Sequence, residues 1–275
     1  MPAALESASV RPPAVAGQFY TRNPQRLRAE VAELLAGVPQ GAPAAPKALI
    51  APHAGYVYSG KVASAAFAAL GAHAQAITRV VLIGPAHYVR LRGIAVPTAR
   101  AFDTPLGRVP VDHAALEAIA DLPFVTVADA PHAPEHALEV ELPFLQTVLD
   151  SFALVPMLVG DATPQQVAEV LGRLWSAGDT LIVVSSDLSH YHDYETAQRL
   201  DGATAETIEA GDWARLGPGD ACGFLAVAGL LVEADRRGLK TRRLALCNSG
   251  DTAGTRERVV GYGAWAFDEP SRSLA

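Results

Sequence analysis

The chain has 275 residues, half of them hydrophobic, two cysteines and a formal net charge of −7 at pH 7. It is long enough for one large core or two small ones, and its mild acidity without a basic block argues against a nucleic-acid-binding surface. The longest apolar run, residues 224–232, is too short to cross a bilayer, and the lack of a signal-like start and of a cysteine framework leads us to expect a cytoplasmic protein.

Short β-branched runs alternate with longer amphipathic stretches, which predicts an α/β fold with a mainly parallel central sheet flanked by helices. In chain order, strands are expected at about residues 47–51, 79–84, 94–96, 125–128, 153–159, 179–185, 242–246 and 259–267. Helices are expected at about residues 24–36, 62–70, 112–122, 134–149, 164–177, 194–210 and 221–237, with a hairpin at 102–111. No linker divides the interior, so we expect one domain over residues 11–268 between flexible tails at 1–10 and 269–275.

The stretch from residue 134 to 149 has a leucine every three or four positions, which predicts one continuous helix. Glu135 and His136 would then lie in its first turn. The dipole at a helix N-terminus favours acidic side chains and lowers the pKa of an imidazole, so His136 could act as a neutral hydrogen-bond partner. An ordinary polar first turn explains the same residues equally well, and the sequence favours neither interpretation.

His53, His87 and His190 each follow one of the expected strands. In a parallel α/β sheet, ligands collect beyond the carboxyl ends of strands, and turn chemistry alone would favour Asn, Asp or Ser there. We therefore favour a ligand role over a structural one for His53 and His87. Asp187 and the neighbouring serines can fix the tautomer of His190 or hold it protonated, which suits proton transfer. His192 can simply face solvent and ranks below His190.

The two cysteines compete for a place in the same site. Cys247 ends the strand at 242–246, which by the strand-end argument makes it a further ligand candidate. Cys222 lies in the first turn of the helix expected at 221–237, where free amide donors and the helix dipole stabilise a thiolate. Either could instead be a small buried apolar side chain, the commoner role of a free cysteine. The residues alone do not decide between them.

The order and spacing of six motifs resemble those of the Memo family, from about residue 11 to 267. The motifs are Ala16-Gly-Gln-Phe-Tyr20, Ala51-Pro-His-Ala-Gly-Tyr56, Gly84-Pro-Ala-His87, Glu135-His-Ala-Leu-Glu139, Ser185-Ser-Asp-Leu-Ser-His190 and Cys222-Gly223. The resemblance implies a fold similar to that of class III extradiol ring-cleaving dioxygenases. Bacterial members are described as the B component of the AmmeMemoRadiSam set, which implies an AMMECR-type protein and a radical-SAM protein as partners.

Carried over to this sequence, the resemblance implies that His53, His87 and Cys222 bind a metal. His190 falls at the acid/base position with Asp187 beside it, and His136 is a second pocket histidine. The dioxygenases hold Fe(II) with two histidines and one carboxylate, whereas a thiolate moves the preference toward copper or zinc. The expected function is a metal-dependent oxidoreductase with iron or copper, zinc being a further option, that acts on a small, redox-active or aromatic substrate.

Two other functions stay open from the sequence. A retained enzyme-like pocket could bind a metal, metabolite or peptide without catalysis, and the Ala/Leu-rich helices could supply a homodimer face. A zinc hydrolase would use two histidines, one cysteine and a water molecule. The hydrolase is the weaker alternative, because no glutamate accompanies the histidines at a metalloprotease spacing.

Overall fold

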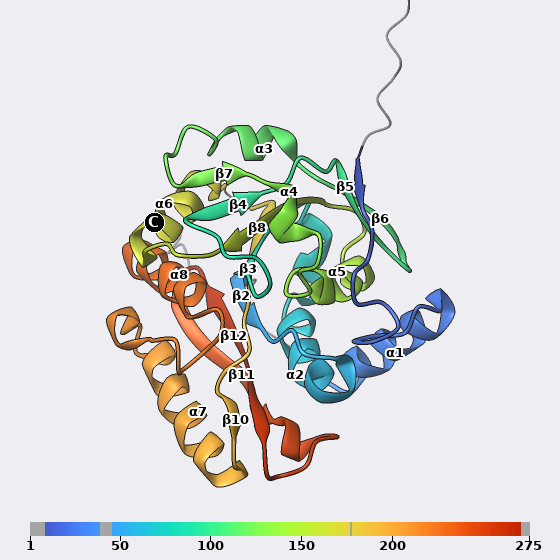
Figure 1. The fold of residues 1–275 in the computed structure, drawn as a ribbon, viewed down its shortest axis with the longest axis vertical. Helices are drawn as coiled ribbons and strands as arrows, with labels where there is room; N and C mark the ends of the chain where they lie inside the picture. Colours follow the sequence, from blue (N-terminus) through green and yellow to red (C-terminus); the bar gives the residue numbers. More distant parts are fainter. Residues whose placement is uncertain (1–8, 39–45, 177, 271–275) are drawn as a thin grey trace, which may run out of the picture.

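A large sheet forms the centre of the molecule. The computed structural model describes residues 9–38, 46–176 and 178–270. The sheet has nine strands in the order β10-β12-β2-β9-β3-β8-β4-β7, and β11 pairs with β12 outside this path (Figure 1). Its strands are β2 Pro46–Ala51, β3 Arg79–Pro85, β4 Ile94–Val96, β7 Val125–Val127, β8 Ala153–Val159, β9 Thr180–Ser185, β10 His190–His192, β11 Lys240–Asn248 and β12 Val259–Asp268. Every strand expected from the sequence is present, so the α/β class is confirmed.

The sheet is mixed rather than mainly parallel. β2, β9, β3 and β8 run parallel to one another, and β4 runs parallel to β7. β4 is antiparallel to β8, and β12 is antiparallel to β2, β10 and β11. The chain passes from β3 to β4 and from β11 to β12 without an α-helix, and connections of that kind join antiparallel strands. The predicted parallel arrangement is therefore right for the four central strands and for the edge pair β4 and β7, but not for the sheet as a whole.

A second sheet contains three short strands: β1 Val10–Arg11, β5 Ala101–Thr104 and β6 Gly107–Pro110. β5 and β6 form the hairpin expected over residues 102–111. Val10 of β1 pairs with Ala101 of β5, so Val10 belongs to the fold rather than to the predicted N-terminal tail. Ser9 is also described, and its backbone oxygen accepts a hydrogen bond from the N–H of Arg100, whereas residues 1–8 and the predicted tail residues 271–275 lie outside the described residues.

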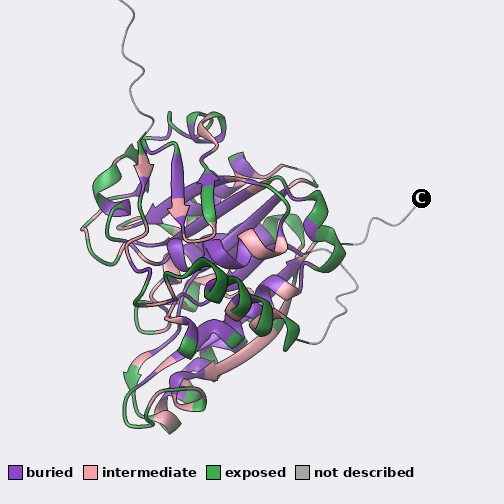
Figure 2. Cartoon of the chain, turned by 90° about the vertical axis from the view of Figure 1, so that its right-hand side faces the viewer, coloured by how far each residue is buried: buried purple, intermediate pink, exposed green. Residues whose placement is uncertain are grey.

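Helices cover both faces of the large sheet. Figure 1 shows α6, α7 and α8 on one side and α1, α2 and α5 on the other, and Figure 2 shows the central strands between them as buried. The α-helices are α1 Pro24–Ala36, α2 Tyr56–Ala68, α3 His113–Glu117, α4 Asp129–His132, α5 Leu142–Val148, α6 Pro164–Leu174, α7 Tyr194–Glu209 and α8 Phe224–Arg237. The 3₁₀ helices are η1 Gly71–Ala76, η2 Glu139–Glu141, η3 Trp213–Arg215 and η4 Ser249–Asp251.

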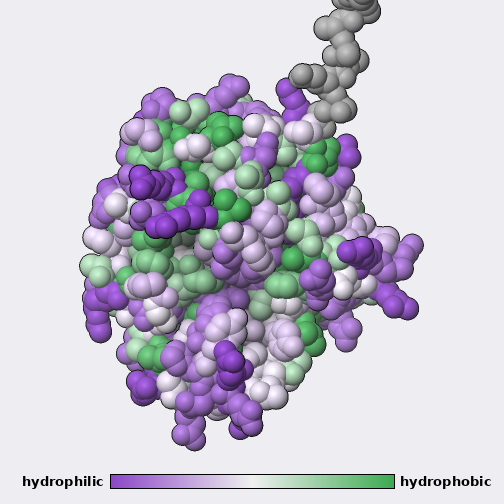
Figure 3. Space-filling model, in the orientation of Figure 1, coloured by the Kyte–Doolittle hydropathy of each residue, from purple (hydrophilic) through white to green (hydrophobic). Residues whose placement is uncertain are grey.

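No described helix combines the length and apolarity of a membrane span. Hydrophobic and hydrophilic residues are interspersed over the face in Figure 3.

Helix boundaries with a specific capping signal agree with the sequence. Asn23 accepts a hydrogen bond from the backbone N–H of Arg26 at the start of α1. Thr163 and Gln166 form a reciprocal capping box at the start of α6. Gly238 ends α8 in the left-handed region at φ 66°. α3 and α6 lack a comparable signal at their C-terminal ends, and both end earlier than predicted.

The stretch from residue 134 to 149 is not the single helix that we predicted. It forms turns, then η2, and then α5. Pro143 cannot donate a backbone hydrogen bond, so it fits the first turn of α5 and not the interior of a longer helix. Glu139 is buried, and its carboxylate accepts hydrogen bonds from the backbone of Ala14 and Val15 at 2.6 and 2.9 Å. His136 therefore lies in a turn before η2, where the helix-dipole argument does not apply.

Candidate metal centre

The carboxyl ends of three neighbouring parallel strands define the position of the site. β9 lies between β2 and β3, and Ala51 of β2 is paired with Ser185 of β9. His53 and His87 each follow their strand by two residues. The register therefore brings both histidines to the end of β9, as the strand-end pattern predicts.

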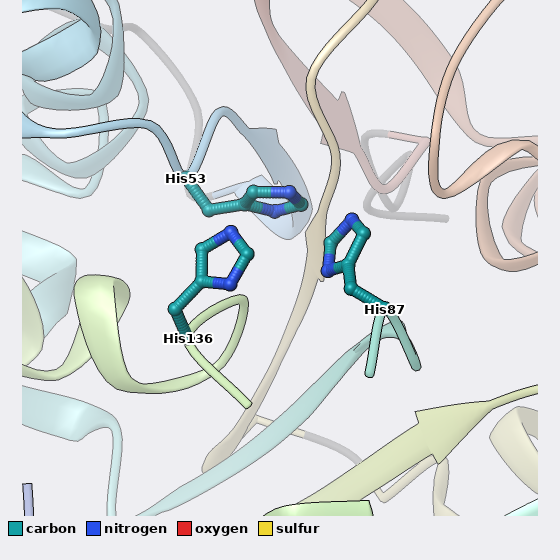
Figure 4. Close-up of side chains that lie close together, drawn as sticks. All are labelled: His53, His87 and His136. Atoms are coloured by element: carbon teal, nitrogen blue, oxygen red, sulfur yellow. The ribbon is translucent and has the colours of Figure 1, made fainter. Parts of the chain in front are cut away.

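Three histidines converge at this edge of the sheet. The metal-binding nitrogen atoms offered by His53, His87 and His136 all lie within 4.8 Å of one another. Figure 4 shows the three rings around a common space, and their centroids are 4.8 to 5.3 Å apart. An ion about 2.1 Å from each nitrogen requires them roughly 3–3.4 Å apart, so small ring rotations would complete a coordination site.

His53 is fixed by hydrogen bonds to its backbone and its ring. Its Nδ1 lies 2.7 Å from Ser185 Oγ, and its backbone N–H donates to Asp187 Oδ1 at 2.8 Å. Burial, with the rings of His136 and His87 nearby, holds the pKa of His53 well below its usual range. The imidazole is therefore neutral. With the hydrogen on Nδ1, its Nε2 is free to bind a metal.

Glu135 connects the other two histidines of the group. Its Oε1 lies 2.9 Å from His87 Nδ1 and 3.2 Å from His136 Nδ1, and its carboxylate also accepts the backbone N–H of both residues. Burial alone would raise the pKa of Glu135, but hydrogen bonds from His136 and His87 outweigh it and hold that pKa well below its usual range. A carboxylate on Nδ1 orients an imidazole with Nε2 toward a metal. Glu135 was not predicted as a site residue, although it is an acid that directly precedes a pocket histidine in the sequence.

Cys222 lies beside the three histidines. Its Sγ is 3.4 Å from His53 Nε2 and 3.3 Å from the backbone nitrogen of Asp187. α8 begins at Phe224, so Cys222 precedes the helix instead of lying in its first turn. Burial, and then the charge of Asp187, raise the pKa of Cys222 to about 12, so the free group is a thiol and not the stabilised thiolate that we expected. Its role as a metal ligand stays a prediction.

His190 is oriented by a peptide carbonyl and not, as predicted, by Asp187. Its Nδ1 donates to the backbone oxygen of Leu188 at 2.8 Å, while Asp187 accepts the backbone N–H of His53. The carbonyl of Leu188 belongs to the same segment, two residues before His190, and it lies within hydrogen-bond reach of the ring. Burial raises the pKa of Asp187 to about 7 and lowers the pKa of His190, so His190 is neutral near pH 7.

The three histidines line one pocket of about 970 Å³ together with Asp187, His190 and Cys222, and a pocket of this size suits a small organic molecule. Aromatic side chains form much of its remaining wall: Phe19, Tyr58, Tyr88, Tyr191 and Tyr262. Four large hydrophobic residues at the pocket are exposed to solvent: Val57, Tyr58, Tyr88 and Tyr191. The pocket therefore combines a cluster of imidazole rings with aromatic surface around them.

The ordered motifs that build this pocket match a known family. A family model described as Memo-like protein matches residues 11–266. The chain belongs to the Memo-like family. It is 32% identical to a MEMO1 family protein of Sulfolobus acidocaldarius, over 92% of this chain and 97% of the relative. It is 34% identical to one of Aquifex aeolicus (92% and 97%) and 35% identical to one of Thermotoga neapolitana (92% and 98%).

A solved structure shares the fold of this Memo-like chain. It is described as an uncharacterized protein from Escherichia coli K12 and aligns with a TM-score of 0.51 at 14% sequence identity. The alignment covers 79% of this chain and 98% of that one. The likeness supports the α/β architecture alone, and the expected relation to class III extradiol dioxygenases stays a prediction.

Three further residues of the Memo-like chain occupy places that the sequence left open. Cys247 lies inside β11 opposite Tyr262, and not beyond a strand end, so we assign it no role. His192 is exposed in β10 and is among the residues that line the pocket. Tyr191 has a φ of 64°, which is strained for a residue with a side chain, and it lies in the pocket wall next to His190. Backbone strain of this kind is typical of functional segments.

Proposed function

We propose that this Memo-like protein is a metal-dependent oxidoreductase. His53, His87 and His136 would hold iron or copper through Nε2, and Cys222 would supply a sulfur ligand. The observation that carries the proposal is the position of Nδ1: a protein oxygen lies within 2.7 to 3.2 Å of it in all three rings, which leaves each Nε2 available.

The donor set fits a transition metal. Imidazole nitrogen suits iron, copper and zinc, and a thiolate adds a preference for copper(I) or zinc. Bound iron or copper would supply one-electron redox chemistry, and zinc would not. Binding would displace the proton of the Cys222 thiol, which makes metal uptake dependent on pH.

The chain's own residues would handle substrate and protons. Phe19 and His136, whose ring centroids are 4.9 Å apart, offer a stacking surface to a small aromatic molecule. His190 is neutral and held by Leu188, so it can accept a proton from a bound substrate. Asp187 accepts the backbone N–H of His53, so it would connect the loop that carries His53 to the segment that carries His190.

Metal content tests the assignment of the ligands. Protein purified anaerobically should bind one ion per chain, and His87→Ala and Cys222→Ser should each weaken binding by at least about tenfold. His73→Ala is the control, because His73 is exposed in η1 away from the pocket. If the two pocket variants bind as much metal as the wild type, the site is wrong.

Oxygen uptake tests the activity itself. The metal-loaded protein should consume oxygen with a panel of catechols, and His190→Ala should lower the rate while metal content stays unchanged. No uptake with any catechol by fully loaded protein would contradict the proposed activity but not the metal site.

A second candidate function is supported by the exposed pocket rim. Val57 and Tyr191 are each 63% exposed and Tyr88 is 57% exposed, and apolar residues gathered in this way are typical of protein contacts. A binding protein that works with the AMMECR-type and radical-SAM partners would use this rim, and a homodimer could also form there. Co-purification of the partners with wild type but not with a Tyr88→Ser, Tyr191→Ser double variant would favour this function.

A further inference from the structure

A buried carboxyl group behind the histidines has no role in the proposed function. Glu141, the last residue of η2, is completely buried, and its Oε1 lies 2.9 Å from Ser185 Oγ. Its Oε2 has no hydrogen-bond partner, and no ion pair involves Glu141 within residues 9–38, 46–176 and 178–270. The ionisable groups near it are Tyr56 of α2, Asp187 beyond β9 and, across the hydroxyl of Ser185, the neutral ring of His53; none of the three is a cation.

The partners of Ser185 determine which atoms carry hydrogen. Its Oγ lies 2.6 Å from the backbone oxygen of Ala137, 2.7 Å from His53 Nδ1 and 2.9 Å from Glu141 Oε1. A hydroxyl donates one hydrogen bond and accepts two. The carbonyl of Ala137 can only accept, so the single hydrogen of Ser185 goes to it. The other two partners must therefore both donate, His53 through Nδ1–H and Glu141 through a carboxylic O–H.

We propose that Glu141 is a neutral carboxylic acid that positions two of the metal-binding histidines through Ser185. The hydroxyl of Ser185 contacts the ring of His53 and also the carbonyl of Ala137, which directly follows His136. With Glu141 donating to it, this hydroxyl keeps the hydrogen of His53 on Nδ1 and holds the turn of His136 in place. In the described part of the chain no hydrogen bond joins the carboxyl group of Glu141 to either histidine, so it is a positioning residue and not a ligand.

The electrostatic surroundings agree with the hydrogen count. Burial is the main cause that raises the pKa of Glu141 well above its usual range, and the charge of Asp187 acts in the same direction. A carboxylate buried without a cation is strongly disfavoured, and such a group keeps its proton instead. An ionised Glu141 would take the hydrogen of Ser185 and leave the carbonyl of Ala137 at 2.6 Å without a donor.

Infrared spectroscopy of the metal-free, full-length chain tests the protonation state. The wild type should show the carbonyl stretch of a neutral carboxylic acid near pH 7, and Glu141→Gln should lose that band. Glu233→Gln is the matched control, because Glu233 is also buried in the described part but is paired with Arg237. If the Glu141→Gln difference spectrum shows only a carboxylate band, the proposal is overturned.

Metal binding tests the positioning role, which rests on the proposed metal site. Ferrous iron is titrated anaerobically against a competing chelator. Glu141→Gln keeps an N–H donor for Ser185 and should bind iron within about threefold of wild type, whereas Glu141→Leu and Ser185→Ala should bind it about 10- to 100-fold more weakly. An equal loss in Glu141→Gln and Glu141→Leu would overturn the proposal.

The two tests separate this inference from the proposed function. The nitrogen chemical shifts of His53 in metal-free protein report its tautomer, and Ser185→Ala should mix the tautomers while Glu141→Gln should not. If no variant, nor the wild type, binds iron, the proposed function fails while the infrared and tautomer results still decide the state of Glu141. If Glu141→Leu does not fold, the iron affinities of Glu141→Gln and Ser185→Ala are compared with that of the wild type instead.

Discussion

The site is built from two regions whose positions are determined in different ways. The ends of β2, β3 and β9 are placed by a regular hydrogen-bonded register between buried strands. The segment from residue 135 to 141 lacks a continuous helix or strand and instead contains three buried glutamates: Glu135, Glu139 and Glu141. The first region depends on backbone pairing and apolar burial. The second depends on carboxyl groups whose partners come from elsewhere in the chain.

The three glutamates show how a buried acid can be accommodated in distinct ways. Glu139 accepts hydrogen bonds from Arg11 and Tyr20 at 2.5 and 2.6 Å. Glu135 binds two histidines. We propose that Glu141 keeps its proton. Substitutions in the two regions should therefore have different effects on stability and on metal binding.

Glu139→Gln should be the most damaging single change to stability. It removes the charge that faces Arg11, and breaking a buried ion pair by changing one partner costs about 3–5 kcal/mol. Urea unfolding measures the loss. Asp103→Asn, in the exposed pair with Arg108, is the control and should change the midpoint little. A loss below about 1 kcal/mol for Glu139→Gln would show that this segment is not held by its glutamates.

Glu135→Gln should weaken metal binding while the protein stays folded. The carboxylate of Glu135 accepts hydrogen bonds from His87 Nδ1 and from the backbone N–H groups of His87 and His136, whereas an amide has only one accepting oxygen. Residues that hydrogen-bond to metal ligands in this way typically contribute about 10- to 100-fold to metal affinity. Chelator competition measures the change. Glu117→Gln, at an exposed position in α3, should leave affinity at the wild-type level. Equal affinities for both variants would remove Glu135 from the site.

Stability should depend on pH in a way that Glu141→Gln removes. The pKa of Glu141 is raised in the folded state. The contribution of Glu141 to the free energy of unfolding is therefore complete below its pKa in the unfolded chain, about 4.3, and is lost as pH rises toward its pKa in the folded protein. The stability of wild type relative to Glu141→Gln should therefore fall by up to about 1.4 kcal/mol per pH unit above that point. Urea unfolding from pH 4 to pH 8 gives the slope, and a flat difference would contradict a raised pKa.

Ile83→Val should have the smallest effect of the four. Ile83 is fully buried in β3, and removing one methylene group there costs about 0.5–1.5 kcal/mol. Its backbone pairs with β8 and β9 on both sides, so His87 should keep its place and metal affinity should be unchanged. Lower iron affinity in Ile83→Val would mean that the strand ends are as sensitive to packing as the glutamate segment.

The sequence predicted the first region well because its signals are local. Apolar runs followed by histidines identify buried strands and their ends, and Asn23, Thr163 and Gly238 mark helix boundaries through their own chemistry. The direction of β4 and β12 was missed, because the pattern of a buried strand is the same whether its neighbour is parallel or antiparallel.

The second region was misjudged because its determinants are distant. The leucine stripe of residues 134–149 resembles a helix, while Pro143 and three acids in an apolar stretch argue against one. The partners of Glu139 lie 119 to 128 residues earlier in the chain, so no local pattern could reveal them. The carbonyl that orients His190 is likewise invisible in the sequence, because every residue carries one.

The attachment of the N-terminal segment to Glu139 also constrains the order of events during synthesis. Residues 11–20 leave the ribosome before Glu139 is synthesised. Arg11 and Tyr20 bind the carboxylate of Glu139, which follows them in the chain by 128 and 119 residues. Phe19 belongs to the same segment and forms part of the pocket wall. The N-terminal segment therefore cannot reach its final position until Glu139 has been synthesised. The pocket wall that contains Phe19 is completed only after that point.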